Sequence, residues 1–299
     1  MISRVTQQTV QRSTLSNLQQ NLRTMSDLQA KLSSGKTIRR ASDDPSAANR
    51  AMTLRADHAA ATQAKRNADD GASWLAQIDT ALQGAVNVVH RARELTVRGA
   101  NSASIGGPAV DSIATELEGL RDAMLDIANS SLNGRSLFAG TSADGAAFDG
   151  AGSPTPYAWH GTSGASVERR IGPQATVRVD ADGAAAFGEG ATSVFQLFDD
   201  IAADLRAGTD ISGRLSELDS RLESMLTSVT DVGVRYKQLL DAQSSLALSL
   251  QNTTSALSGV EDIDLAHTIL ELQMQEVAYQ GALGATARVL QPTLMDFLR

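Results

Sequence analysis

The chain has 299 residues, of which 42% are hydrophobic and only 4% aromatic, and its net charge is −8. This content is enough for a core, and so few aromatic residues are typical of long helices rather than of a thick globular interior. The sequence contains no cysteine, which excludes disulfides, thiolate metal sites and cysteine nucleophiles.

The N-terminal residues predict an amphipathic helix that ends near Gly35, a residue typical of helix C-termini. Ser42-Asp43-Asp44-Pro45 then offers capping side chains and a proline suited to the first turn of a second helix. That helix is expected to continue to about Gly99. The N-terminus lacks the apolar stretch of a cleaved signal peptide, and no apolar run approaches the roughly 20 residues of a membrane span.

A third helix is predicted after the break at Gly106-Gly107-Pro108, and it is expected to end at Asn133-Gly134. Composition then changes, because residues 134–190 contain eleven glycines and three of the six prolines. Residues 167–171 and 175–179 alternate in strand fashion between turn signals. We therefore predict a small β-rich insert held together by aromatic side chains, with a disordered segment as the alternative. These aromatic residues are Phe138, Phe148, Tyr157, Trp159 and Phe187.

A further helix is predicted over residues 194–205, followed by a break at 208–213 and then by the longest pattern in the chain. From residue 215 to 260, fourteen positions recur at alternating steps of three and four, and all but two carry an apolar or aromatic side chain. A period of 3.5 residues places a narrow seam along one helix, and such a seam needs a partner helix. The seam consists of Leu215, Leu218, Leu222, Met225, Val229, Val232, Tyr236, Leu239, Gln243, Leu246, Leu250, Thr253, Leu257 and Val260.

The two ends of the chain carry opposite charge. Residues 1–40 contain seven basic side chains and one acid, whereas residues 260–299 contain six acids and two basic side chains. A basic arm can indicate nucleic-acid binding, but this arm is apolar-periodic and has no aromatic residue, so we expect no nucleic-acid partner. Mutual attraction of the two ends is the simpler interpretation.

Sequence features of an enzyme are missing. The four histidines are not at metal-ligand spacing, and the chain has neither a phosphate-binding glycine loop nor a Gly-x-Ser-x-Gly elbow. Asp43 and Asp44 are better explained as helix N-terminal acids than as a catalytic pair. We therefore expect no enzymatic activity, no cofactor, no metal and no membrane partner.

Four segments, in order, resemble the bacterial flagellins and their relatives. These are residues 33–48 (SSGKTIRRASDDPSAA), 67–75 (NADDGASWL), 91–97 (RARELTV) and the stretch from 262 (DIDLA) to 287. Within this superfamily, Pro45, residues 133–141 and the ending 294–299 resemble the flagellin-like protein of the hook–filament junction. Arg39-Arg40 departs from the Asn-Ser pair that is common in the filament subunit, which remains the alternative.

The resemblance implies a mainly α fold in which the N- and C-terminal regions form a long coiled-coil rod with a central β-rich insert. Residues 1–45 and 260–299 should form an inner terminal coiled coil, 46–135 and 191–259 a helical rod domain, and 136–190 an outward-facing insert. It also implies export by the flagellar type III apparatus without a cleaved signal peptide, and an extracellular location in the flagellum. The implied partners are like subunits in a ring, the other junction protein, flagellin, and an export chaperone at the C-terminal helix.

From the patterns and the resemblance together, we expect an assembly interface but no catalytic or ligand site. A coiled-coil adaptor outside flagella is a further alternative, although it would lack the four motifs. An enzyme with its active site in the insert would need ligand spacing there, and only His160 is present. The expected interface residues are Leu15, Leu18, Leu22, Met25, Leu32, Arg93, Glu94, Leu246, Leu250, Leu257, Ile263, Ile269, Leu272 and Leu283.

Overall fold

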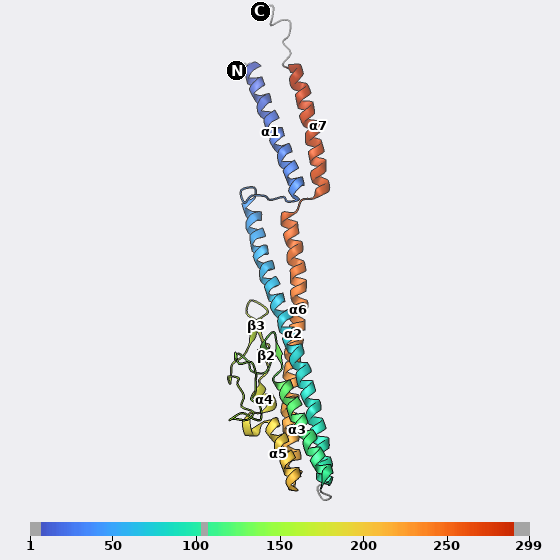
Figure 1. Ribbon diagram of the computed structural model, residues 1–299. Coiled ribbons are helices and arrows are strands. Elements are labelled where there is room, and N and C mark those ends of the chain that lie inside the picture. The colour runs from blue at the N-terminus through green and yellow to red at the C-terminus, as the bar shows by residue number, and fades with distance from the viewer. Residues whose placement is uncertain (1–6, 103–106, 290–299) are drawn as a thin grey trace, which may run out of the picture. The chain divides into compact units, whose positions relative to one another are not determined.

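The computed structural model describes residues 7–102 and 107–289, and these are mainly helical, as predicted (Figure 1). The closing residues 294–299 and Gly106 of the expected break lie outside the described residues. The elements, in chain order, are α1 (Gln7–Ser34), α2 (Pro45–Ser102), α3 (Pro108–Ala128), β1 (Ser131–Leu132), β2 (Arg135–Ser136), β3 (Glu168–Arg170), β4 (Thr176–Arg178), α4 (Gly183–Phe187), the 3₁₀ turn η1 (Gly190–Thr192), α5 (Val194–Ala207), α6 (Ser212–Glu261) and α7 (Leu265–Val289).

The predicted signals at the first helix boundary are confirmed. Gly35 follows the end of α1 with a φ of 67°, and its N–H donates to the Lys31 carbonyl at 2.8 Å. Asp44 directly precedes α2, and its carboxylate accepts a hydrogen bond at 2.9 Å from the N–H of Ala47 in the first turn of that helix. Sequence therefore specifies both ends of this connection.

The predicted end of the third helix is wrong by several residues. Helix α3 ends at Ala128, and Asn133-Gly134 instead forms the two-residue turn between β1 and β2, with φ values of 53° and 77°. Asn-Gly is favoured both after helices and in tight hairpin turns, because both need positive φ. In this chain Asn133-Gly134 forms the hairpin turn. The residue that follows α3, Asn129, accepts hydrogen bonds at its side-chain oxygen from the N–H groups of Ala147 and Phe148, at 2.8 Å each.

Helix α6 confirms the predicted seam. It is a single helix of 50 residues, and every one of the fourteen seam positions is buried or half-buried. Large apolar side chains of α6 outside the seam, such as Leu240 and Leu248, are 42% and 62% exposed. The register read from the sequence is therefore correct along the whole helix.

By packing, the chain forms two units. One contains residues 1–59 and 250–299, and the other contains residues 60–249, with α2 and α6 contributing to both. The three-part division expected from the sequence refers to positions in an assembly, and it stays a prediction.

Within residues 60–249, helices and insert share one hydrophobic core. Helix α2 contacts α3 through Arg91–Glu116 and α6 through Arg93–Asp219, while α3 packs along α5 (Figure 1). Strands β3 and β4 confirm the two predicted strand segments, and they pair antiparallel, but the insert has only short strands and is mostly irregular. Its aromatic rings hold it together as predicted, and they continue into α5, where Phe195 meets Phe148 at a centroid distance of 5.2 Å and Tyr157 at 5.4 Å.

Candidate assembly surfaces

The described residues offer little that resembles a chemical site. Among them, no group of three or more His, Cys, Asp or Glu side chains is placed to hold a metal ion. Nor is any helix in the described ranges long and apolar enough to cross a membrane. The surfaces that stand out are the uncovered apolar faces of helices.

The structure places the expected interface residues on several elements. Leu15, Leu22, Ile269 and Leu283 are between 40% and 59% exposed. The other apolar members, which lie on α1, on α6, in the α6–α7 linker and on α7, are half-buried: Leu18, Met25, Leu32, Leu246, Leu250, Leu257, Ile263 and Leu272.

The two charged members of that set have partners within the chain. Arg93 Nε lies 2.7 Å from Asp219 Oδ1 on α6, and Glu94 lies 3.3 Å from Arg91 on its own helix. Both pairs are exposed and contribute little to stability. Their role in an interface between subunits stays a prediction.

Helices α1 and α7 pack against each other (Figure 1), and the α7 side of this contact is largely polar. The buried and half-buried positions of α7 recur at helical spacing, and only one of them carries a large aliphatic side chain. They are Thr268, Glu271, Leu272, Gln275, Tyr279, Ala282 and Thr286. A helix that turns such a face to its partner gains little from hydrophobic burial.

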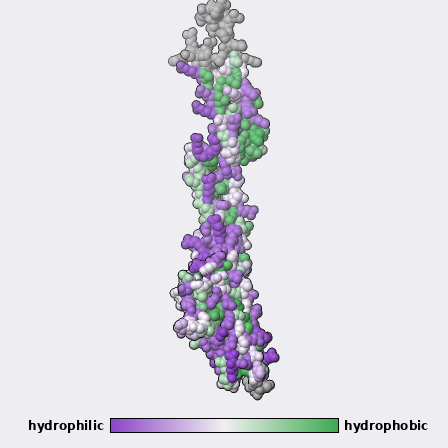
Figure 2. Space-filling view, in the orientation of Figure 1, coloured by the Kyte–Doolittle hydropathy of each residue, from purple (hydrophilic) through white to green (hydrophobic). Residues whose placement is uncertain are grey.

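The opposite side of α7 carries an apolar stripe that our sequence reading missed. Leu270, Met274 and Val277 recur at steps of four and three and are 57%, 63% and 69% exposed. Leu265 and Ile269 extend the apolar surface, which appears as a green patch over α7 in Figure 2. The same spacing rule that identified the α6 seam would have found this stripe, had it been applied to both faces of the C-terminal helix.

Within the part of the chain that the structure describes, the opposite charges of the two ends meet at one point. Among the described residues, Lys36 is paired with Glu261 and Asp262, at 3.3 and 2.6 Å, which is the predicted attraction between the ends. Along the helices themselves, Arg12 and Arg23 of α1 and Glu276 of α7 make no ion pair within the ranges that the structure describes. These charges are available to another molecule.

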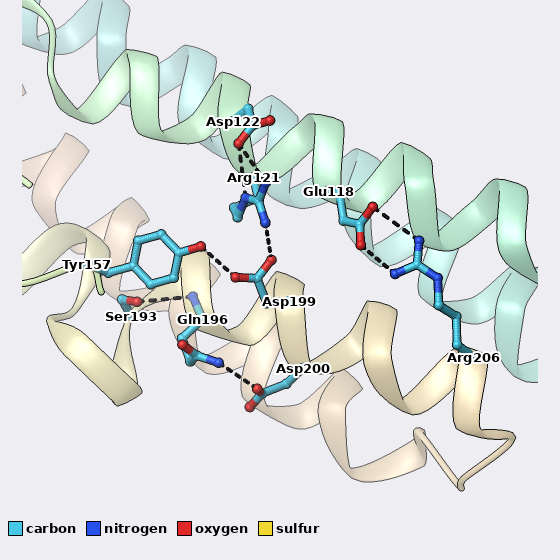
Figure 3. Close-up of polar contacts among 9 residues, drawn as sticks. All are labelled: Glu118, Arg121, Asp122, Tyr157, Ser193, Gln196, Asp199, Asp200 and Arg206. Atoms are coloured by element: carbon cyan, nitrogen blue, oxygen red, sulfur yellow. Dashed lines mark hydrogen bonds and ion pairs between the residues drawn. The ribbon is translucent and has the colours of Figure 1, made fainter. Parts of the chain in front are cut away.

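A polar seam between α3 and α5 anchors the insert (Figure 3). Arg206 of α5 holds both carboxylate oxygens of Glu118, at 2.5 and 3.1 Å, and Arg121 of α3 lies 2.5 Å from Asp199. The Tyr157 hydroxyl from the insert donates to the other oxygen of Asp199 at 2.5 Å. The partners are within the chain, so this seam is structural rather than a ligand site.

Known proteins with similar sequences belong to flagella. The family model described as the bacterial flagellin N-terminal helical region matches residues 5–143. Flagellar hook-associated protein 3 of Salmonella typhimurium is 28% identical, over 84% of this chain and 86% of its own. The flagellin of Bacillus subtilis is 26% identical, over 93% of both chains.

Solved structures show the same fold. A putative flagellar hook-associated protein from Vibrio parahaemolyticus matches with a TM-score of 0.64 and 20% identity, over 74% of this chain and all of its own. Flagellar hook-associated protein 3 from Legionella pneumophila matches with a TM-score of 0.62 and 16% identity, over 70% of this chain and 98% of its own. The chain therefore carries a region that matches the flagellin N-terminal helical family over residues 5–143, and its sequence and fold are similar to those of flagellins and hook-associated proteins.

Proposed function

We propose that this protein is the structural subunit of the junction that connects the flagellar hook to the filament. The observation that supports self-assembly most directly is the exposed stripe of Leu270, Met274 and Val277 on α7. An apolar helix face of this kind is unstable in water and is typical of protein–protein contacts. Similarity to hook-associated protein 3 over most of the chain favours the junction among flagellar structures.

In this proposal, like subunits form a ring through their terminal helices. Residues 1–45 and 260–299 form the inner coiled coil, 46–135 and 191–259 the surrounding helical rod, and 136–190 the outward face. The α7 stripe packs against a neighbouring subunit, and the unpaired arginines of α1 provide charge complementarity to acids such as Glu276. Exposed ends of a purified subunit thereby become the interior of the assembly.

The remaining partners follow from the family resemblance. The ring contacts the other junction protein on the hook side and flagellin on the filament side, and it lies outside the cell. Export by the flagellar type III apparatus needs no cleaved signal, and an export chaperone binds the C-terminal helix before export. The structural role accounts for the chain without any catalytic step.

The filament subunit is the second candidate function. It is favoured by the B. subtilis flagellin, which matches over 93% of both chains. A filament subunit and a junction subunit share the terminal helices, so their separation requires a test in cells.

A strain that lacks this gene separates the two functions. The junction role predicts intact hooks and flagellin released unpolymerised into the medium, because the filament has no base on which to grow. Plasmid-borne expression of the chain should restore filaments. Intact hooks with no flagellin subunit produced at all would identify the protein as the filament subunit instead.

A further inference from the structure

The two linkers next to the terminal helices are hydrogen-bonded to each other. Lys36, after α1, and Asp262, after α6, form an isolated antiparallel bridge. The Thr37 N–H donates to the Glu261 carbonyl at 2.6 Å, and the Ile263 N–H donates to the Gly35 carbonyl at 3.1 Å. Moving either linker away from the other would therefore break these backbone hydrogen bonds.

A charge cluster covers this bridge. The Glu261 side chain is only 5% exposed, and it lies 3.3 Å from Lys36 Nζ and 2.8 Å from Arg55 Nε of α2. Lys36 also reaches Asp262 at 2.6 Å, and the Ser258 hydroxyl donates to the other oxygen of Asp262. One buried carboxylate thus connects the end of α6 to the first linker and to the start of α2.

We propose that Glu261 is the positioning residue of a charge-locked joint that holds the end of α1 beside the start of α7, so that both terminal helices dock on a neighbouring subunit as a pair. The joint itself is a property of the single chain. Only its use in docking rests on the proposed junction function.

The electrostatics of the cluster give the joint a pH dependence. Burial alone would raise the pKa of Glu261, but Arg55 and Lys36 outweigh it and hold this pKa below the usual 4.5. Lys36 and Ser258 likewise lower the pKa of Asp262, which shares Lys36. A lowered pKa in the folded state means that the stabilisation is present at neutral pH and is lost as the pH falls through the lowered value.

Amide hydrogen exchange in the full-length chain tests the joint, with the Thr37 and Ile263 amides as reporters. Glu261→Gln removes the charge and keeps the shape, and it leaves two cations without their shared carboxylate. We expect protection of both reporters to fall about tenfold or more at pH 7, as for a buried pair that loses one partner. Glu276→Gln, an exposed glutamate of α7 outside the cluster, is the control and should change neither reporter.

A second variant keeps the test decisive. Lys36→Met should lower the exchange protection of both reporter amides. It leaves the ion pair between Arg55 and Glu261 intact, so its effect should be smaller than that of Glu261→Gln. Unchanged protection in Glu261→Gln, or loss at Thr37 with full protection at Ile263, would overturn the joint. Either result leaves the null-strain test of the junction function unaffected, so the two proposals can fail separately.

Discussion

Asp199 shares one carboxylate between Arg121 of α3 and Tyr157 of the insert, and Tyr157 also has an unusual backbone conformation. Tyr157 has a φ of 58°, which is uncommon for a bulky residue and costs on the order of 1 kcal/mol. Its ring is fully buried beside Phe195, and its hydroxyl donates to Asp199. Burial and this hydrogen bond together raise the pKa of Tyr157 above its ordinary value.

The first prediction concerns that hydroxyl. Tyr157→Phe should lower the free energy of unfolding by about 1–3 kcal/mol, because a buried hydrogen bond to a charged group is lost. Tyr236→Phe is the matched control, since the Tyr236 hydroxyl makes no hydrogen bond within the described residues, and it should change stability by less than about 0.5 kcal/mol. Urea unfolding of both variants measures the difference, and equal losses would mean that Asp199 is not an effective partner.

Sequence could predict the aromatic residues of the insert but not this network. The five aromatic side chains stand out by type alone, in a segment that is otherwise poor in large apolar residues. Arg121, Tyr157 and Asp199 come from separate parts of the chain, and Asp199 lies 78 residues after Arg121 and 42 residues after Tyr157. No local spacing connects them, because only the tertiary packing of α3, α5 and the insert brings them together.

At the scale of elements, periodicity was the most reliable guide. The α6 seam is correct at every position because one side of a long helix must be covered along its whole length. The helix end predicted at Asn133-Gly134 is wrong because Asn-Gly suits both a helix C-terminus and a hairpin turn. Which of the two forms depends on whether strands can pair on both sides. The stripe on α7 is not predicted because this helix has apolar residues on more than one face, whereas a search for one seam per helix identifies only one apolar face.

Neighbouring leucines of α6 provide the second prediction. Leu239 is fully buried on the seam, whereas Leu240 is 42% exposed. Leu239→Ala should lower the free energy of unfolding by about 2–5 kcal/mol, the usual cost of truncating a buried leucine. Leu240→Ala, the same change one residue later, should cost less than about 1 kcal/mol by thermal or urea unfolding. Similar costs at both positions would show that the seam register is wrong.

The insert provides the third prediction. Replacing residues 142–188 with a short Gly/Ser linker should destabilise residues 60–249, because Phe148, Tyr157 and Phe187 would no longer cover Phe195. Replacing only the exposed residues 143–146 with Gly/Ser of equal length should be nearly neutral. A full replacement with an unchanged melting temperature would show that the helices form their core without the insert.

At the scale of the whole molecule, the two packing units differ in how much apolar surface they leave uncovered. Among the described residues, fourteen large hydrophobic side chains are exposed, and nine of them lie in residues 1–59 and 250–299, for example Met274 and Val277. The unit with residues 60–249 instead buries most of its aromatic residues in one core, with Trp159 and Tyr236 partly buried against it. This contrast is expected if the first unit completes its packing only against other subunits.

The fourth prediction follows from the weak α1–α7 interface. Its few buried apolar side chains offset little of the ordering entropy, which is about 1–2 kcal/mol per residue. Limited proteolysis of the purified chain should therefore remove most of α1 and α7 and stop near the joint, at about residues 35 and 265. The same bonds should be protected in assembled flagella. Terminal helices that resist protease in the free subunit would contradict this view.

The most direct test of the assembly account uses the absence of cysteine, because one introduced thiol is then a unique probe. Val277→Cys lies on the exposed α7 stripe, and Ser163→Cys lies on the exposed surface of the insert. Both should react quickly with a maleimide in the purified chain. In isolated flagella, we predict that Ser163→Cys still reacts and that Val277→Cys is protected, because neighbouring subunits cover the stripe. Equal reaction of Val277→Cys in the free and assembled states would contradict the account.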